Sequence, residues 1–126
     1  MLCAMKASMR HHLVLGRRGE NLAATYLFDQ GLVILDRNWR CSMGEIDIVA
    51  RDGDVVVMCE VKTRSSHRFG SPFEAITAQK ANRLQRLAFA WLQEQGLGPR
   101  ELRFDVLAIV DSGMGEPELT HHQHVV

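Results

Sequence analysis

Four ionisable residues, Glu45, Asp47, Glu60 and Lys62, occur in two neighbouring β-rich stretches, at positions that strand alternation brings to one face. Carboxylates gathered in this way need cationic partners, because burying an acidic cluster without compensation costs several kcal/mol. Lys62 could neutralise one carboxylate, and a divalent metal could neutralise two. The alternative is an exposed strand end with solvated charges, which alternation alone slightly favours.

Two segments with helical spacing carry polar residues beside their apolar sides. Glu20 borders the apolar stripe of the first segment, and Lys80 falls inside the apolar sector of the second. Together Gln79, Lys80, Arg83 and Arg86 make one edge of the second segment polar and cationic, which suits a phosphate backbone. The alternative for Lys80 is a buried stem that extends its amine to solvent.

Hydrophobic periodicity and turn residues predict the elements that would position these groups. Apolar residues at helical spacing, ended by glycine, indicate helices, and β-rich runs with short polar separators indicate hairpins. The predicted helices cover residues 15–30 and 73–95. The predicted strands cover residues 32–40, 45–51, 55–62 and 102–110, with a weak last strand over 118–125. The order α-β-β-β-α-β(-β) predicts an α/β protein with a mixed β-sheet flanked by helices.

The length and composition are those of one globular domain. The 126 residues are 46% hydrophobic and 24% charged, which excludes a disordered chain. We expect residues 1–11 to form a flexible N-terminal tail and residues 12–126 a single domain. No apolar run approaches the roughly 18 residues of a membrane span, so no membrane association is expected. A zero net charge means that any nucleic-acid binding would have to come from a local patch.

The cysteines and the N-terminal sequence favour a cytoplasmic protein. Three cysteines show no metal-ligand spacing and fit reduced thiols, and the apolar stretch at the start is too short for a signal peptide.

Other polar and aromatic residues are expected to be structural. Asp105, in the middle of an apolar run, should anchor loops or a helix end through hydrogen bonds. Trp39 and Trp91 should be core residues rather than platforms for stacking bases. Solvated side chains near the C-terminus, rather than metal ligands, are expected for His121, His122 and His124.

The sequence closely resembles the YraN-like family of small bacterial proteins over about residues 16–112. The resemblance is carried by motifs in the family's order: GRRGENLAATYL (16–27), GLVILDRNWR (31–40), GEIDIVA (44–50), EVKTR (60–64), FGSPFEAI (69–76), QKANRL (79–84) and RFDVLAIV (103–110). Members of this family are similar to the restriction-endonuclease-like superfamily, which includes archaeal Holliday-junction resolvases, and they are described as predicted nucleases.

The resemblance implies a set of site residues on a restriction-endonuclease-like core. The superfamily signature, an Asp followed by Glu-x-Lys on the next strand and often a Glu on the preceding helix, maps onto Asp47, Glu60, Lys62 and Glu20. The signature's proline is absent, and Ile46 stands in its place.

The implied chemistry is metal-dependent hydrolysis. Metal ligands would be Asp47, Glu60, the Val61 carbonyl and Glu20, binding Mg²⁺ or Mn²⁺, while Lys62 would orient the attacking water or stabilise the transition state. The residues expected to contact nucleic acid are Thr63, Arg64, His67 and Arg68, in a loop beside the site, and Gln79, Lys80 and Arg83 on the following helix. An ordinary polar loop is the alternative for the first four.

Two hypotheses for function follow. In the first, the protein is a Mg²⁺- or Mn²⁺-dependent endonuclease acting as a homodimer on nucleic acid, with DNA as the expected substrate and branched or repair intermediates among the candidates. In the second, the protein keeps the nuclease fold but serves as a non-catalytic nucleic-acid-binding or protein-adaptor module. The presence of Asp47, Glu60 and Lys62 favours the enzyme, and the neutral net charge keeps the adaptor open.

Overall fold

The computed structural model describes residues 7–66 and 77–126, with side chains described from residue 17 onward. Its elements follow the predicted order. They are α1 (Ala7–Asp29), β1 (Val33–Cys41), β2 (Gly44–Asp52), β3 (Val55–Arg64), α2 (Ala78–Glu94), β4 (Leu102–Val110) and β5 (Glu118–His122). The α/β fold and the α-β-β-β-α-β-β order predicted from the sequence are confirmed.

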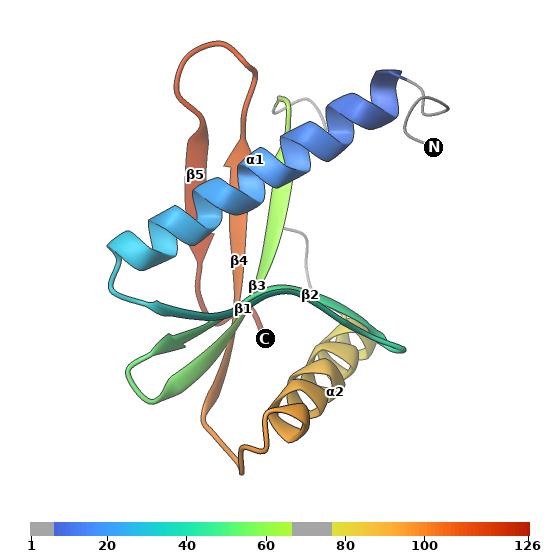
Figure 1. The fold of residues 1–126 in the computed structure, drawn as a ribbon, viewed down its shortest axis with the longest axis vertical. Coiled ribbons are helices and arrows are strands. Elements are labelled where there is room, and N and C mark those ends of the chain that lie inside the picture. Colours follow the sequence, from blue (N-terminus) through green and yellow to red (C-terminus); the bar gives the residue numbers. More distant parts are fainter. Residues whose placement is uncertain (1–6, 67–76) are drawn as a thin grey trace.

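The five strands form one mixed sheet in the order β1-β2-β3-β4-β5. Neighbouring strands are antiparallel except for β3 and β4, which are parallel and are joined through α2. A crossover of this kind is what parallel neighbours require. Figure 1 shows α1 crossing the sheet obliquely and α2 lying beside the strands at the other end of the molecule.

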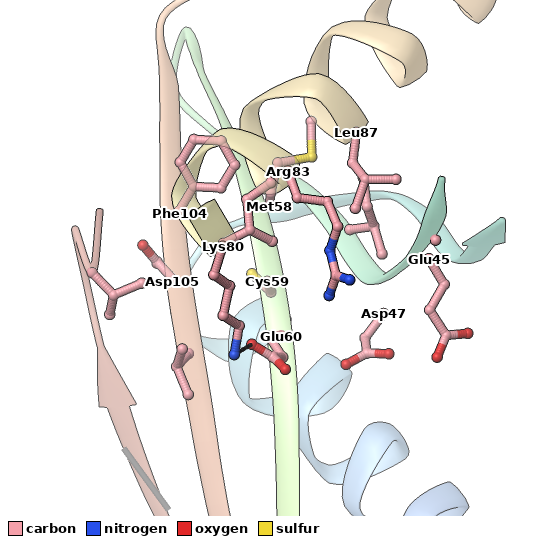
Figure 2. A pocket seen from close by; sticks show the side chains of 15 residues that line it. Glu45, Asp47, Met58, Cys59, Glu60, Lys80, Arg83, Leu87, Phe104 and Asp105 are labelled. Carbon is pink, nitrogen blue, oxygen red and sulfur yellow. Dashed lines mark ion pairs between the residues drawn. The ribbon is translucent and has the colours of Figure 1, made fainter. Parts of the chain in front are cut away.

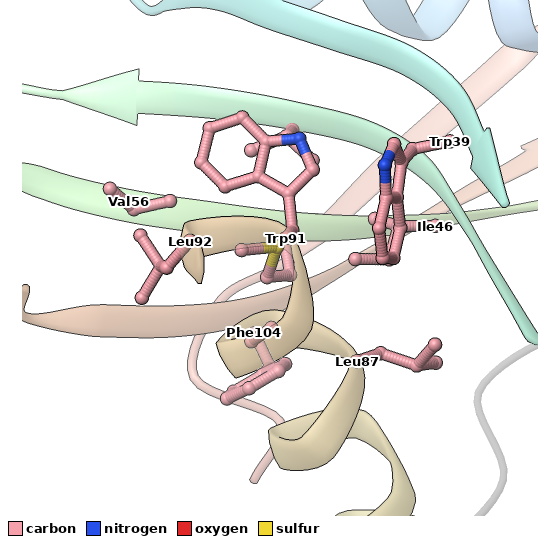
Figure 3. Packing of buried hydrophobic residues seen from close by; sticks show 10 residues of the cluster. Trp39, Ile46, Val56, Leu87, Trp91, Leu92 and Phe104 are labelled. Atoms are coloured by element: carbon pink, nitrogen blue, oxygen red, sulfur yellow. The ribbon is translucent and has the colours of Figure 1, made fainter. Parts of the chain in front are cut away.

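The two helices pack on opposite faces of the sheet, as the alternation of side chains along β3 shows. Val57 and Cys59 pack in a cluster with Ala23 and Leu27 of α1. The intervening β3 residues belong to the α2 side, whose cluster is shown in Figure 3. That cluster contains Trp39, Ile46, Val49, Val56, Met58, Leu87, Ala88, Trp91, Leu92 and Phe104.

Two tryptophans join β1 to α2 by crossed hydrogen bonds. The indole nitrogen of Trp39 donates to Glu94 Oε2 at 2.7 Å, and that of Trp91 donates to Asp36 Oδ2 at 3.0 Å. Both rings are buried, so their indole N–H groups need acceptors and find them. The prediction that both are core residues is confirmed.

One face assignment from alternation is wrong. Alternation groups Ile46 with Ile48 and Ala50, but Ile46 packs in the α2 cluster whereas the other two pack under α1. The reason is that the register of β2 with β3 ends at Ile48, and the start of β2 pairs with β1 alone, opposite Trp39. At this level Ile46 and its partner Trp39 both pack in the α2 cluster.

The helix starts also differ from the sequence-based bounds. α1 begins at Ala7 rather than near residue 15, so residues 7–11 of the expected tail are helical, while residues 1–6 lie outside the described residues. This upstream stretch has no proline, which allows a helix to extend without an apolar stripe to mark it. The described part of α2 begins after Thr77, whose side chain accepts a hydrogen bond from Lys80 N as an N-cap. Residues 73–76 lie outside the described residues.

Asp105 is the centre of a buried polar network under α1. Its carboxylate accepts hydrogen bonds from the Arg103 guanidinium at 3.0 Å, from His121 Nε2 at 2.7 Å and from His124 N at 3.3 Å. Tyr26 OH lies 3.2 Å from His121 Nδ1 and links the network to α1. The structural role expected for Asp105 is confirmed.

The solvated state expected for His121 is wrong, because its side chain is only 8% exposed. The last strand, β5, ends in this network rather than fraying into solvent. Neither described helix combines the length and the apolar character needed to cross a membrane.

Candidate active site

Asp47 lies at the point where β2 and β3 separate. The paired residues of the two strands run from Asp52 opposite Val55 to Ile48 opposite Cys59, and Asp47 and Glu60 come next on each strand. Beyond this point the Asp47 side chain bridges the gap, because its Oδ2 accepts a hydrogen bond from Val61 N at 2.8 Å. The N–H and C=O of one strand residue point to the same edge, so the Val61 carbonyl also faces β2.

The environment of Asp47 disfavours its negative charge. Burial is the main cause and raises the pKa of Asp47 from 3.8 to about 6, against the hydrogen bond from Val61, which lowers it. The carboxylates of Glu45, Glu20 and Glu60 raise the pKa further. The carboxylates of the predicted acidic cluster therefore lie close enough together to disfavour the charge of Asp47.

Cations reach this cluster from α2. Lys80 Nζ lies 3.8 Å from Glu60 Oε2, with each side chain about one third exposed, at 34% and 35%. Figure 2 shows Arg83 extending from the same helix toward the mouth of the site, above Asp47. Lys80 thus does more than extend to solvent, because its amine pairs with a site carboxylate.

Lys62 follows Glu60 by two residues on β3, so alternation places it on the same face. It is half-buried. The face predicted for Glu60 and Lys62 is consistent with the packing of Val56 and Met58 against α2 on the same side of β3.

Glu20 lies near the cluster but is held by β1. Its Oε1 accepts hydrogen bonds from Asn38 Nδ2 at 2.6 Å and from the Arg37 guanidinium at 3.3 Å. Asn38 adopts a positive φ of 53°, a conformation that asparagine tolerates better than most residues. Sequence reasoning missed both partners, since nothing in the spacing of β1 connects them to a helix residue 17 or 18 positions earlier.

Thr63 and Arg64 are in β3 rather than in a loop. Thr63 lies on the α1 face, opposite to Glu60 and Lys62, where Gly19 packs so closely that a Cβ at Gly19 would overlap Thr63 Oγ1. Arg64 is exposed, and its guanidinium donates to Thr63 O at 3.1 Å. The structure thus separates Thr63 from the acidic cluster.

The remaining residues predicted to contact nucleic acid divide into two groups. Gln79 and Arg83 lie exposed in the first turns of α2, on either side of Lys80. His67 and Arg68 lie outside the described residues.

A cavity of about 270 Å³ opens beside the acidic cluster, between α2 and the sheet. Its mouth is charged, and the groups there are Glu45, Asp47, Glu60, Lys80 and Arg83 (Figure 2). Its floor is apolar, with the side chains of Met58, Leu84, Leu87, Phe104, Val106 and Val125 among those that line it. Sequence reasoning missed this floor because its residues have the pattern of ordinary core positions.

The donor set fits a hard divalent cation that keeps most of its water. Among the side chains that the structure describes, in residues 17–66 and 77–126, no group of three His, Cys, Asp or Glu is placed to hold a metal ion. Mg²⁺, however, usually takes only one or two protein carboxylates together with water and substrate phosphate. Asp47, Glu60 and the Val61 carbonyl meet that requirement, whereas Arg37 and Asn38 engage Glu20.

Comparison with known proteins places the chain in a family. Residues 19–109 match the model of a family described as "Uncharacterised protein family UPF0102", and this span includes Glu20, Asp47, Glu60, Lys62 and Lys80. A UPF0102 protein of Nocardioides sp. is 54% identical over 107 residues, which cover 85% of this chain and 86% of that relative. One from Arthrobacter sp. is 56% identical over 113 residues, covering 90% and 96%. The chain therefore belongs to the UPF0102 family, which is the YraN-like family.

Proposed function

We propose that this protein is an endonuclease that hydrolyses phosphodiester bonds in nucleic acid, with Mg²⁺ or Mn²⁺ as its cofactor and DNA as its substrate. The observation that carries the proposal is the position of Asp47 and Glu60. Each lies next to the last paired residue of its strand, Ile48 in β2 and Cys59 in β3, at the point where the two strands separate. Lys62 lies two residues beyond Glu60, on the same face of β3.

The chain's own residues have separate tasks in this reaction. Asp47 and Glu60 would hold the cation, and the hydrogen bond from Val61 N fixes the orientation of the Asp47 carboxylate. When bound, the cation would lower the pKa of water and offset negative charge on the reacting phosphate. Lys62 carries a compact cation with three N–H donors, which can hold the attacking water and stabilise negative charge in the transition state.

The residues of α2 bind the substrate. Arg83 lies at the mouth of the cavity and is exposed, which suits a contact with a phosphate oxygen. The amine of Lys80, at 3.8 Å from Glu60, forms a loose ion pair and has further N–H donors that can bind a phosphate oxygen. These contacts would be sensitive to salt, as phosphate contacts generally are.

The test is a cleavage screen with linear, flapped, nicked and four-way DNA, and with matched RNA, in Mg²⁺, Mn²⁺ or chelator. We expect cleavage that needs metal and that Asp47→Ala abolishes, while Asp54→Ala, a change at an exposed turn carboxylate, leaves it intact. Binding without cleavage of any substrate would instead support a non-catalytic nucleic-acid-binding module.

The proposed enzyme acts as a homodimer, because one domain of 126 residues offers little surface for binding nucleic acid. The cytoplasm is its proposed location, as the sequence predicts. Light scattering coupled to size exclusion, with and without substrate, tests the dimeric state. A protein that remains monomeric when bound to its substrate would contradict it.

A further inference from the structure

The cavity beside the acidic cluster has two chemically different parts. Its charged mouth serves the proposed reaction, but its apolar floor has no task in metal binding or in phosphate binding. Three of the floor residues are almost fully buried: Met58 is 4% exposed, Leu87 2% and Phe104 8%. Leu84, a floor residue from α2, is half-buried.

The size of the whole cavity limits what can occupy its floor. The cavity measures about 270 Å³ with its mouth included, slightly below the range of pockets for drug-sized ligands, roughly 300–1,000 Å³. One flat ring system fits in such a space, and a nucleic-acid duplex does not. Leu84 and Val125 are half-buried and present the accessible apolar surface against which a nucleobase can pack, whereas Phe104 and Met58 expose little of their side chains.

The charged groups at the mouth indicate which ring system would enter. Lys80 and Arg83 attract a phosphate, and Asp47 and Glu60 are where the proposed cation would meet it. The base of the same nucleotide, or of its neighbour, is tethered within a few ångströms of that phosphate. The floor is the apolar surface that lines the same cavity as these charged groups.

We infer that the apolar floor receives an unpaired nucleobase of the bound strand, so that the site takes nucleic acid with an unpaired nucleotide in preference to continuous duplex. This inference rests on the proposed function and names its substrate class. In a duplex the bases are paired and stacked, so a base could enter only after being flipped out, which costs unstacking energy. Single strands and flaps present such a base without that cost.

The first experiment separates the base from the backbone. Fluorescence anisotropy measures binding of labelled dT12 and of a 12-unit strand of abasic sites, which has the same phosphates and no bases, in chelator and at one low salt concentration. We expect the abasic strand to bind about 5- to 150-fold more weakly, the range for losing one stacked base. Equal affinities for the two strands would overturn this inference. The proposed function would still stand if the substrate screen showed cleavage of duplex.

A variant localises the effect to the cavity. Leu84→Trp places a large ring inside the cavity. The variant should therefore bind dT12 about as weakly as the parent binds the abasic strand, and its affinity for the abasic strand should equal that of the parent. Gln85→Trp adds the same ring to an exposed position of α2 outside the cavity and should leave both affinities unchanged. Unaltered dT12 binding by a folded Leu84→Trp protein would place the base elsewhere.

Two further probes test the identity of the occupant. A dT12·dA12 duplex should bind more weakly than dT12 although it carries more phosphates; tighter binding of the duplex would contradict the inference. Thymidine monophosphate should displace dT12 only at concentrations far above the dissociation constant of dT12. Equal affinity for the mononucleotide would mean that the cavity is a free-nucleotide site. If no oligonucleotide binds or is cleaved, the proposed function fails as well.

Discussion

Replacing Asp47 by asparagine should stabilise the protein at neutral and higher pH. The folded structure raises the pKa of Asp47 from 3.8 to about 6, chiefly by burial. When folding raises the pKa of a carboxyl group, that group leaves the free energy of unfolding unchanged below its unfolded pKa. It lowers that free energy as the pH rises through the folded pKa. Because a tenfold change in a dissociation constant is about 1.4 kcal/mol, ionised Asp47 should lower the free energy of unfolding by about 3 kcal/mol above pH 7.

Asparagine has the same shape, keeps an oxygen for the Val61 N–H and carries no charge. Asp47→Asn should therefore gain up to about 3 kcal/mol at pH 8 and only about 0.5 kcal/mol at pH 4, where the native carboxyl is already protonated. Urea unfolding of parent and variant at the two pH values measures the difference, with Asp54→Asn as the control at an exposed carboxylate. A variant that is less stable than the parent at pH 8 would refute the claim that the ionised carboxylate of Asp47 destabilises the folded protein.

Three further predictions concern the metal and the packing. Millimolar Mg²⁺ or Mn²⁺ should raise the melting temperature of the parent but not of Asp47→Asn, because a ligand of the native state stabilises it; a thermal-shift titration without any rise for the parent would count against the site. Gly19→Ala should lower the free energy of unfolding by about 1–3 kcal/mol through overlap with Thr63, and Thr63→Ala in the same chain should recover part of it; unchanged stability in urea would contradict the close contact of α1 with β3. Asp105→Asn should lower the free energy of unfolding by about 1–3 kcal/mol, since the buried Arg103 loses one of its two charged partners and keeps only Asp52, and denaturation showing no loss would contradict that role.

Local pattern was sufficient for those parts of the fold and site that depend on neighbours in the sequence. The strand over residues 102–110 is apolar on both faces, and it appears with those bounds because it is covered on both sides. The acidic cluster could be predicted because the alternation of β3 fixes the face of Glu60 whatever the rest of the chain does.

Contacts between distant segments could not be predicted in this way. Tyr26 and His121 are 95 positions apart, and their contact depends on how α1 crosses the sheet. The change of face at Ile46 results from β2 leaving β3, which is a property of the assembled sheet rather than of the β2 sequence.

The partners of two site residues were missed for the same reason. Glu60 pairs with Lys80 across the sheet–helix interface, and Glu20 is held by Asn38, whose positive φ no spacing rule reveals. The apolar floor of the cavity was missed because core residues that leave a space look like core residues that fill it.

The central claim is that Asp47, Glu60 and Lys62 form a hydrolytic site, and the most direct test is single-turnover cleavage by Lys62→Ala with metal binding measured in parallel. The variant retains both proposed metal ligands, so metal binding and nucleic-acid binding should survive while the cleavage rate falls about 10²- to 10³-fold, as when one transition-state donor is removed. Glu60→Gln should instead lower metal binding and cleavage together. If Lys62→Ala cleaves as fast as the parent, the activity does not belong to this site, and a non-catalytic binding role would replace the one proposed.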